Sequence, residues 1–231
     1  MSIPVQARGI IGRRILGADI SYPGVSEAMR GTHYGPLRMG KMRFHPVVHL
    51  PSDYEVYDFS QGYDPNRART SQYGVGKYAE KRPGMYLGDQ FVDTGRDVHV
   101  GVDLAGPVGE GVHCFLEGHI FLMHDNDREY DYGPTIITRH EWLGQEVFAL
   151  HGHLSRESLE RWRLGDAFEA GARLGHLGSS EVNGGWNPHV HFQLSRLEPT
   201  LCDLPGAVRE EDAEWALRAF PDPQLVLGRL Y

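Results

Sequence analysis

Cysteine is scarce in this sequence: its 231 residues include only Cys114 and Cys202, and these form no C-x-x-C pair. A redox motif and a zinc site built on cysteines are therefore excluded. We expect two buried, reduced thiols, with one disulfide between them as the alternative. Long apolar runs are missing as well, because the longest, such as Val147–Leu150, fall far short of the ~18 residues that a membrane helix requires.

An excess of basic residues is also missing, since 23 lysines and arginines stand against 31 aspartates and glutamates, a net charge of −8. A surface with this much negative charge repels phosphate backbones and anionic lipid. We therefore expect neither nucleic acid nor a membrane as a partner. The start, Met1–Gln6, lacks a charged region followed by an apolar stretch, and Arg13 and Arg14 interrupt the only candidate. We find no secretory signal and expect a cytoplasmic protein.

The motifs of two enzyme classes are absent. The chain has no G-x-S-x-G elbow for a serine nucleophile, and Gly74-Val-Gly-Lys77 lacks the spacing of a phosphate-binding loop. It also shows no internal repeat. At ~150 residues per domain the length predicts one domain with appendages, and 40% hydrophobic and 23% charged residues are ordinary for a globular protein.

Turn formers are abundant: 29 glycines and 14 prolines, spread throughout, predict many turns and few long helices. Helices are predicted at Arg156–Arg163, with Ser155 as the cap, and at Arg209–Phe220, which Pro221 ends. Segments rich in β-branched or aromatic residues and bounded by turn formers predict strands at Val98–Leu104, Gly118–Met123, Thr135–Thr138, Glu146–Leu150 and His189–Leu194.

Histidine is the unusual residue, with 13 copies. Two H-x-H pairs occur, His151/His153 and His189/His191, where roughly 0.7 would arise by chance. Positions i and i+2 of a strand share a face, so each pair could direct two imidazoles into one groove. The alternative is that the pairs are ordinary surface or core histidines.

A third element, His99-Val-Gly-Val-Asp103, changes this balance. On a straight strand the two side chains would share a face but lie ~13 Å apart, too far to bind one ion. They can converge only if the strand bends, and Gly101 permits a kink or bulge. Two imidazoles, a carboxylate and one open position form a catalytic zinc arrangement. The alternative is that Asp103 is a turn residue.

His45-Pro-Val-Val-His49 has the separation of a helical metal pair, but Pro46 and the two valines disfavour a helix, so the sequence favours a structural role. A structural role is also predicted for five further histidines, namely His113, His119, His124, His140 and His176.

In order, these residues resemble the lysostaphin-type (LytM-type) zinc metallopeptidases, whose domain carries H-x-G-x-D, then a histidine before leucine and serine, then H-x-H. Five blocks carry the resemblance over about residues 88–197, which is less than half of the chain: His99–Pro107, Tyr132–His140, Leu150–Ser155, Gly171–Gly178 and Asn187–Gln193.

The resemblance implies a zinc ion held by His99, Asp103 and His191, and hydrolysis of an amide bond by zinc-activated water. It implies that His189 and His153 line the cleft as catalytic residues without binding the metal. Substrate contacts are expected from four positions, His151, Tyr132, Trp186 and Asn187. The family usually has an aromatic residue at the position of His151, and commonly a glutamate at that of Gln193.

Two further segments, Gly74–Arg82 and Glu181–Pro188, resemble a leaderless version of this domain that is fused to kinase-like and class-III aminotransferase domains in large bacterial proteins. That version fits a cytoplasmic location. It argues against crosslinked peptidoglycan as the target, because the wall lies outside the membrane.

Together these inferences predict a mainly β fold, an antiparallel β-sheet curved into a groove (the duplicated hybrid motif), with a few short helices. We expect an N-terminal extension packed on the core (1–85), a zinc metallopeptidase-like catalytic domain (86–200) and a C-terminal tail with one helix (201–231). The expected partner is a peptide or a peptidoglycan fragment, and the expected cofactor is Zn²⁺. The alternatives are an inactive binding module and a cytoplasmic metal-dependent amidase or esterase; the sequence does not predict the oligomeric state.

Overall fold

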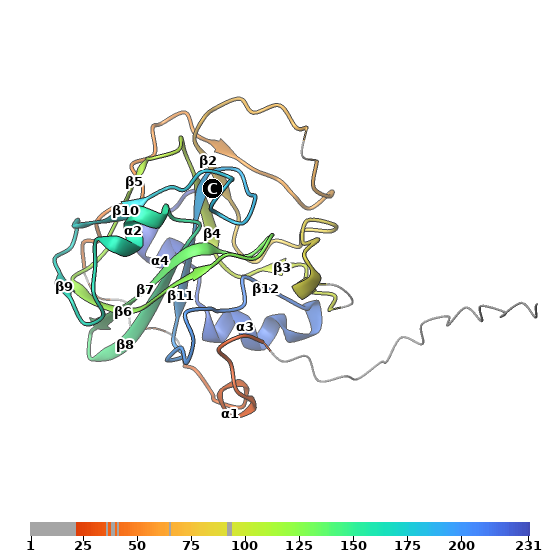
Figure 1. The fold of residues 1–231 in the computed structure, drawn as a ribbon. Coiled ribbons are helices and arrows are strands. Elements are labelled where there is room, and N and C mark those ends of the chain that lie inside the picture. Colours follow the sequence, from red (N-terminus) through yellow and green to blue (C-terminus); the bar gives the residue numbers. More distant parts are fainter. Residues whose placement is uncertain (1–21, 36, 38–39, 41, 65, 92–93) are drawn as a thin grey trace, which may run out of the picture.

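The computed structural model describes residues 22–35, 37, 40, 42–64, 66–91 and 94–231. Its centre is a sheet of eight strands in the order β1-β2-β4-β11-β8-β7-β6-β9, antiparallel except for the β1–β2 pair (Figure 1). Their bounds are β1 Glu55–Val56, β2 Gly74–Gly76, β4 Val102–Ala105, β11 His189–Ser195, β8 Gln145–Gly152, β7 Gly133–Trp142, β6 Gly118–Asn126 and β9 Ala167–Phe168. The predicted mainly β, antiparallel fold is therefore confirmed.

Two small sheets complete the β structure. One pairs β5 (Gly111–His113) with β10 (Arg173–His176), and the other pairs β3 (Val98–His99) with β12 (Ala207–Val208). Strand predictions hold at all five segments, although most of the observed strands run a few residues further. The segment 98–104, which we predicted as one strand, is divided in the structure into two strands, β3 and β4.

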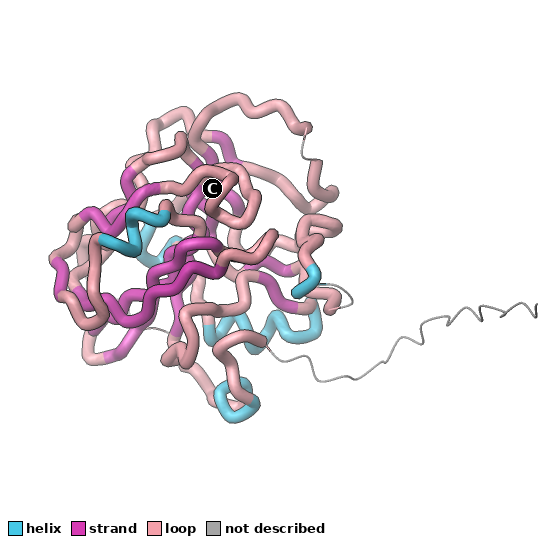
Figure 2. The backbone as a smooth tube through the Cα atoms, viewed as in Figure 1, coloured by secondary structure: helices cyan, strands magenta, loops and turns pink. Residues whose placement is uncertain are grey.

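Helices are few and short, and loops make up much of the remaining chain (Figure 2). They are α1 Glu27–Arg30, η1 Asp89–Phe91, α2 Arg156–Glu160, η2 Glu210–Asp212, α3 Ala213–Ala219 and α4 Gln224–Leu227. None of the helices in the described part of the chain is long and apolar enough to cross a membrane.

The C-terminal tail corrects one prediction. We expected one helix there, but the structure has two α-helices, α3 and α4, with the short η2 turn leading into α3. Pro221 follows the end of α3 as expected. Pro223 then stands at the N-cap of α4, where its φ of −59° suits a helix start and its missing N–H costs nothing, so the chain can resume helical structure.

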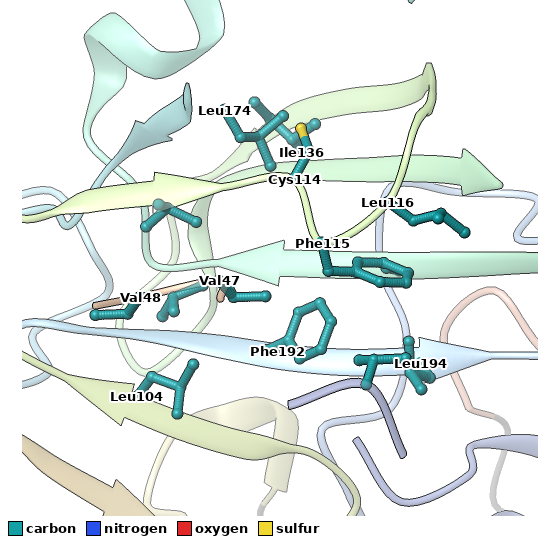
Figure 3. Packing of buried hydrophobic residues seen from close by; sticks show 14 of the residues in the cluster. Val47, Val48, Leu104, Cys114, Phe115, Leu116, Ile136, Leu174, Phe192 and Leu194 are labelled. Atoms are coloured by element: carbon teal, nitrogen blue, oxygen red, sulfur yellow. The ribbon is translucent and has the colours of Figure 1, made fainter. Parts of the chain in front are cut away.

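Successive side chains of β11 point to opposite faces of the sheet, which separates core residues from site residues. Val190, Phe192 and Leu194 point into the larger hydrophobic cluster together with Phe115 and Ile136 (Figure 3). The intervening His189, His191 and Gln193 therefore point to the opposite face of the sheet. Burial of the apolar side chains thus fixes the direction in which the polar ones project.

The N-terminal part of the chain takes part in the main sheet. Strands β1 and β2 form one edge, and β2 pairs with β4 so that Gly76 lies opposite Asp103. Residues that we expected in an extension packed on the core thus supply edge strands beside the H-x-G-x-D segment.

Candidate metal and catalytic site

His99 and Asp103 lie together because the chain breaks between their strands. After His99, β3 turns away to pair with β12, and β4 begins at Val102 in the main sheet. The break brings His99 Nε2 to 3.3 Å from Asp103 Oδ1. Gly101 lies at the break, and a Cβ there would overlap the His191 ring, so the position requires glycine. The bend that Gly101 permits is therefore present.

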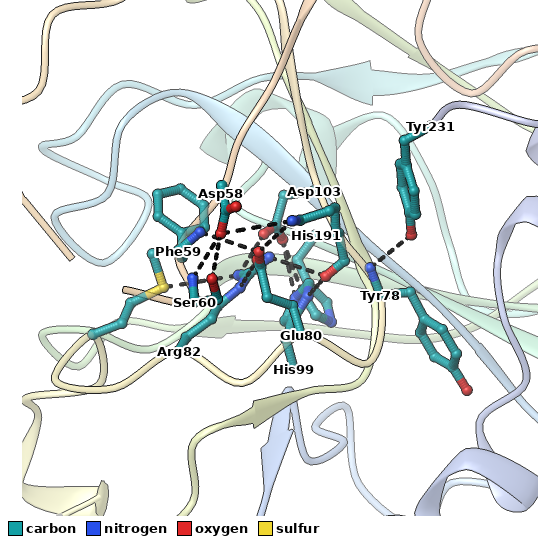
Figure 4. A network of polar contacts seen from close by, with 12 residues as sticks. Asp58, Phe59, Ser60, Tyr78, Glu80, Arg82, His99, Asp103, His191 and Tyr231 are labelled. Carbon is teal, nitrogen blue, oxygen red and sulfur yellow. Dashed lines mark hydrogen bonds and ion pairs between the residues drawn. The ribbon is translucent and has the colours of Figure 1, made fainter. Parts of the chain in front are cut away.

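His191 completes the group from the neighbouring strand. Its register on β11 is directly opposite Asp103 on β4. Its Nδ1 lies 3.2 Å from Asp103 Oδ1 and 3.0 Å from His99 Nε2. Figure 4 shows the three side chains directed toward one another. Among the described residues, His99, Asp103 and His191 are the one group of histidine, cysteine or acidic side chains that could hold a metal ion as they are placed. Their ligand atoms, one from each residue, all lie within 4.8 Å of one another.

In His99 and His191, the outer ring nitrogen, which faces away from the other two residues, determines whether the inner nitrogen, which faces them, carries a proton. His99 Nδ1 is 2.9 Å from the Lys77 carbonyl oxygen, and His191 Nε2 is 2.9 Å from Gln193 Oε1. Each outer nitrogen must carry the proton to donate to its oxygen, so each inner nitrogen presents a lone pair. Three acceptor atoms, two imidazole nitrogens and a carboxylate oxygen, therefore face one another with no proton between them.

The protonation states suit a metal. Burial, reinforced by the Arg82 guanidinium, lowers the pKa of His99 to about 4, so the imidazole is neutral at pH 7. Burial alone would raise the pKa of Asp103, but His99 and Arg82 hold it well below its ordinary value, so the carboxylate is ionised. Neutral imidazole and carboxylate are the forms that bind metal, and an N₂O donor set fits Zn²⁺. The residues present therefore fit the ion that the sequence implied.

A second layer of residues holds these ligands, and sequence reasoning missed it. Arg82 Nη1 donates to Asp103 Oδ2 at 2.8 Å, and its Nε donates to Glu80 Oε2 at 3.1 Å (Figure 4). Lys77 Nζ lies 3.0 Å from Glu80 Oε1, and the Lys77 carbonyl orients His99. The only sequence signal was the resemblance of the segment Gly74–Arg82 to the fused version of the domain, which assigned no role to these residues.

His153 and His189 lie beside the candidate metal ligands with their ring centres 4.3 Å apart. His153 Nδ1 donates to the Asn183 carbonyl at 2.9 Å, and His189 Nδ1 donates to that of Asn187 at 2.6 Å, so each ring keeps its Nε2 lone pair. Burial lowers the pKa of both histidines, which are therefore neutral at pH 7 and able to accept a proton. His189 Nε2 lies 3.7 Å from Asp103 Oδ1, so this lone pair is close to the candidate metal ligands.

Both histidines line a cavity to which several aromatic side chains contribute. Tyr132, Trp186 and Asn187, three of the predicted substrate contacts, line it. The Tyr132 hydroxyl is engaged, since it donates to the Leu204 carbonyl at 2.9 Å, so Tyr132 offers its ring rather than its hydroxyl. Residues outside the predicted catalytic domain also line the cavity, among them Tyr57, Phe59, Tyr63 and Arg69.

His151 is not among the cavity residues, which corrects the fourth predicted substrate contact. Its side chain is fully buried, its ring packs 5.2 Å from Phe192, and its register on β8 is directly opposite Phe192. It therefore lies on the core face of the sheet. We expected His151 and His153 to share a face, but β8 ends at Gly152, and a φ of +64° at His153 breaks the strand alternation.

Comparison with known proteins points in one direction. The model of peptidase family M23 matches residues 97–201, a range that contains all five metal-binding and catalytic candidates. A search of curated proteins finds no match.

Similar solved structures include an M23 protein and two peptidases. The catalytic domain of the prophage-encoded M23 protein EnpA from Enterococcus faecalis is 23% identical over 61% of this chain and 91% of that one, with a TM-score of 0.42. The catalytic domain of the antimicrobial peptidase lysostaphin from Staphylococcus simulans is 22% identical over 53% and 80%, with a TM-score of 0.41. A zinc-containing peptidase from Vibrio cholerae is 23% identical over 60% and 37%, with a TM-score of 0.39.

Proposed function

We propose that this chain is a zinc-dependent peptidase or amidohydrolase of the lysostaphin type. The observation that carries the proposal is the set of three converging lone pairs, on His99, Asp103 and His191, beside two neutral imidazoles that face a cavity. The match of residues 97–201 to peptidase family M23 supports it independently.

When bound, Zn²⁺ would activate water and polarise a scissile carbonyl, which is what amide hydrolysis requires. The proton of the attacking water needs an acceptor, and we assign that role to His189 because its Nε2 is near the ligand atoms. The backbone carbonyl of Asn187 holds its Nδ1–H and so keeps the ring in the accepting tautomer. His153, held in the same manner by Asn183, would assist at the carbonyl oxygen or at the leaving amine.

The test is zinc content measured beside the rate of hydrolysis. His191→Ala should lose one equivalent of zinc relative to wild type, since two protein ligands rarely retain the ion. His189→Ala and His153→Ala should keep the zinc of wild type but lower turnover by ~10² to 10⁴. His124→Ala, at an exposed histidine of β6, is the matched control and should change neither quantity.

The substrates should include glycine-rich peptides, peptides with D-amino acids and matched esters. Hydrolysis of esters alone would replace the peptidase proposal with an esterase. Bound zinc with no hydrolysis in any variant would favour an inactive binding module. Loss of zinc in His189→Ala with retention in His191→Ala would reverse our assignment of the two imidazoles.

The remaining expectations stay part of this proposal. We propose a small peptide or peptidoglycan fragment as substrate, a relationship to the fused version of the domain, and a cytoplasmic location supported by the acidic composition. Cys114 and Cys202 are both free thiols in the structure. Thiol labelling of freshly lysed cells tests the location, because both cysteines should be found reduced.

A further inference from the structure

A second histidine cluster lies outside the site described above. The rings of His45, His49 and His113 contact one another pairwise, with ring centres 5.3 Å apart for His45 and His49, 5.5 Å for His45 and His113, and 5.0 Å for His49 and His113. The sequence singled out only the first pair, and the peptidase proposal uses none of the three.

The backbone holds this cluster in place. The His113 N–H at the end of β5 donates to the Val47 carbonyl at 2.8 Å, and the His45 N–H donates to the Phe115 carbonyl at 2.9 Å. Val47 and Val48, between the two N-terminal histidines, are buried in the larger hydrophobic cluster (Figure 3). Backbone hydrogen bonds and the buried valines therefore hold the segments that carry the three histidines next to each other.

Nitrogen lone pairs are available in the cluster. His113 Nδ1 is buried and has no hydrogen-bond partner within the described part of the chain, an arrangement that is costly for a polar atom. His45 Nδ1 is 2.8 Å from the Pro46 carbonyl oxygen, so it carries the proton and leaves Nε2 free. Burial, followed by the neighbouring His49 and His45, lowers the pKa of His113, so its ring is neutral at pH 7.

The ring spacing matches that of three imidazoles on one ion. With Zn–N bonds of about 2.0–2.1 Å and tetrahedral angles, ring centres would lie roughly 5.2 Å apart. The three measured spacings, 5.0 to 5.5 Å, bracket this value. The nitrogens are not gathered as tightly as those of His99 and His191, so binding requires rotation of the rings about their side-chain bonds. His49 is exposed and His45 half-buried, which leaves room for that rotation.

We propose that His45, His49 and His113 form a second metal site for a divalent ion that imidazole binds, such as Zn²⁺. Binding would connect residues 45–49 to β5 and would give His113 Nδ1 the partner that it lacks. The exposed side of His49 would leave a fourth coordination position to solvent. This site is separate from the proposed catalytic one and does not depend on it.

The experiment is a zinc titration of the full chain against a chromophoric chelator, repeated with Co²⁺, whose absorption reports tetrahedral nitrogen ligation. Wild type should bind two equivalents, His49→Ala one, and His191→Ala one. His49 is exposed, so its substitution should leave the fold intact, which circular dichroism checks; His45→Ala is the second variant. His33→Ala, at an exposed histidine outside both clusters, should keep two equivalents.

Each stoichiometry has a distinct meaning. One equivalent in wild type that is lost in His191→Ala overturns the second site and leaves the peptidase proposal standing. One equivalent that is lost in His49→Ala and kept in His191→Ala supports the second site and contradicts the catalytic one. Two equivalents that survive both His49→Ala and His45→Ala also overturn the proposal, because the second ion must then bind elsewhere.

Discussion

Replacing Arg82 with methionine should separate two effects that the structure joins in one side chain. Arg82 is 3% exposed, and it holds Asp103 Oδ2 at 2.8 Å while Asp103 Oδ1 faces the two histidine ligands. Its guanidinium thus orients a proposed ligand, but it also places a positive charge near the proposed cation site. Arg82→Met removes both effects, whereas Arg82→Lys keeps the charge and loses the planar, forked donor.

The magnitude follows from the contacts that would be lost. Removing one partner of a buried ion pair costs about 3–5 kcal/mol, because the other charge is left unpaired. Glu80 keeps Lys77 Nζ at 3.0 Å and the Phe59 N–H at 3.1 Å, so mainly Asp103 is orphaned and the lower end applies. About 3 kcal/mol corresponds to a fall in Tm of roughly 6–12 °C for a chain of this size. Loss of a hydrogen bond that orients a ligand should weaken zinc binding by about 10- to 100-fold.

Two measurements check this prediction: thermal unfolding of the metal-free protein and chelator competition for zinc. Arg69→Met is the matched control, since Arg69 is exposed, lines the same cavity and forms no ion pair within the described residues. It should leave Tm and zinc affinity near those of wild type. Tighter zinc binding in Arg82→Met would refute the reasoning, because it would mean that charge repulsion by Arg82 outweighs its orientation of Asp103.

Three further predictions follow from single contacts. Burial, followed by Asp131, raises the pKa of Asp203 to about 7, so the folded protein retains a proton there that the unfolded chain releases near pH 4. This group therefore lowers the unfolding free energy as pH rises from ~4 to 7, by at most ~4 kcal/mol. In urea titrations the stability of Asp203→Asn relative to wild type should grow across that pH range and level off above it. A difference that stays constant with pH would contradict this prediction. Gly101→Ala should abolish zinc binding at the His99–Asp103–His191 site with little loss of secondary structure, because the new Cβ overlaps the His191 ring. Unchanged zinc affinity would count against the placement of that ring. His151→Leu should keep zinc and turnover within about twofold, since the side chain is buried on the core face and removal of its unpartnered Nε2 offsets lost packing; a changed substrate preference would restore the sequence-based assignment of His151 to the substrate site.

Local patterns in the sequence determined much of the fold and the first layer of the site. Alternation of apolar and polar residues along His189–Ser195 was enough to predict the strand and to place His189 and His191 on one face. Glycine at position 101 was enough to show that a bend there is permitted, and such a bend brings His99 to Asp103. These features depend on residues that are near in sequence, so a two-residue period and one flexible position identify them.

Only the tertiary structure decided the rest. The local period predicted that His151 would share a face with His153, but the end of β8 and the turned backbone at His153 separate them, and strand ends depend on neighbouring strands. Arg82 reaches Asp103 across 21 positions, and His113 on β5 meets His49, which lies in a loop before β1. Ion pairs and ring contacts of this kind form because chain segments pack together, and a single sequence carries no periodic signal for which segments will meet. The sequence, through its family resemblance, therefore identified the candidate ligands, while the folded chain determined what orients them and which residues enclose the cavity.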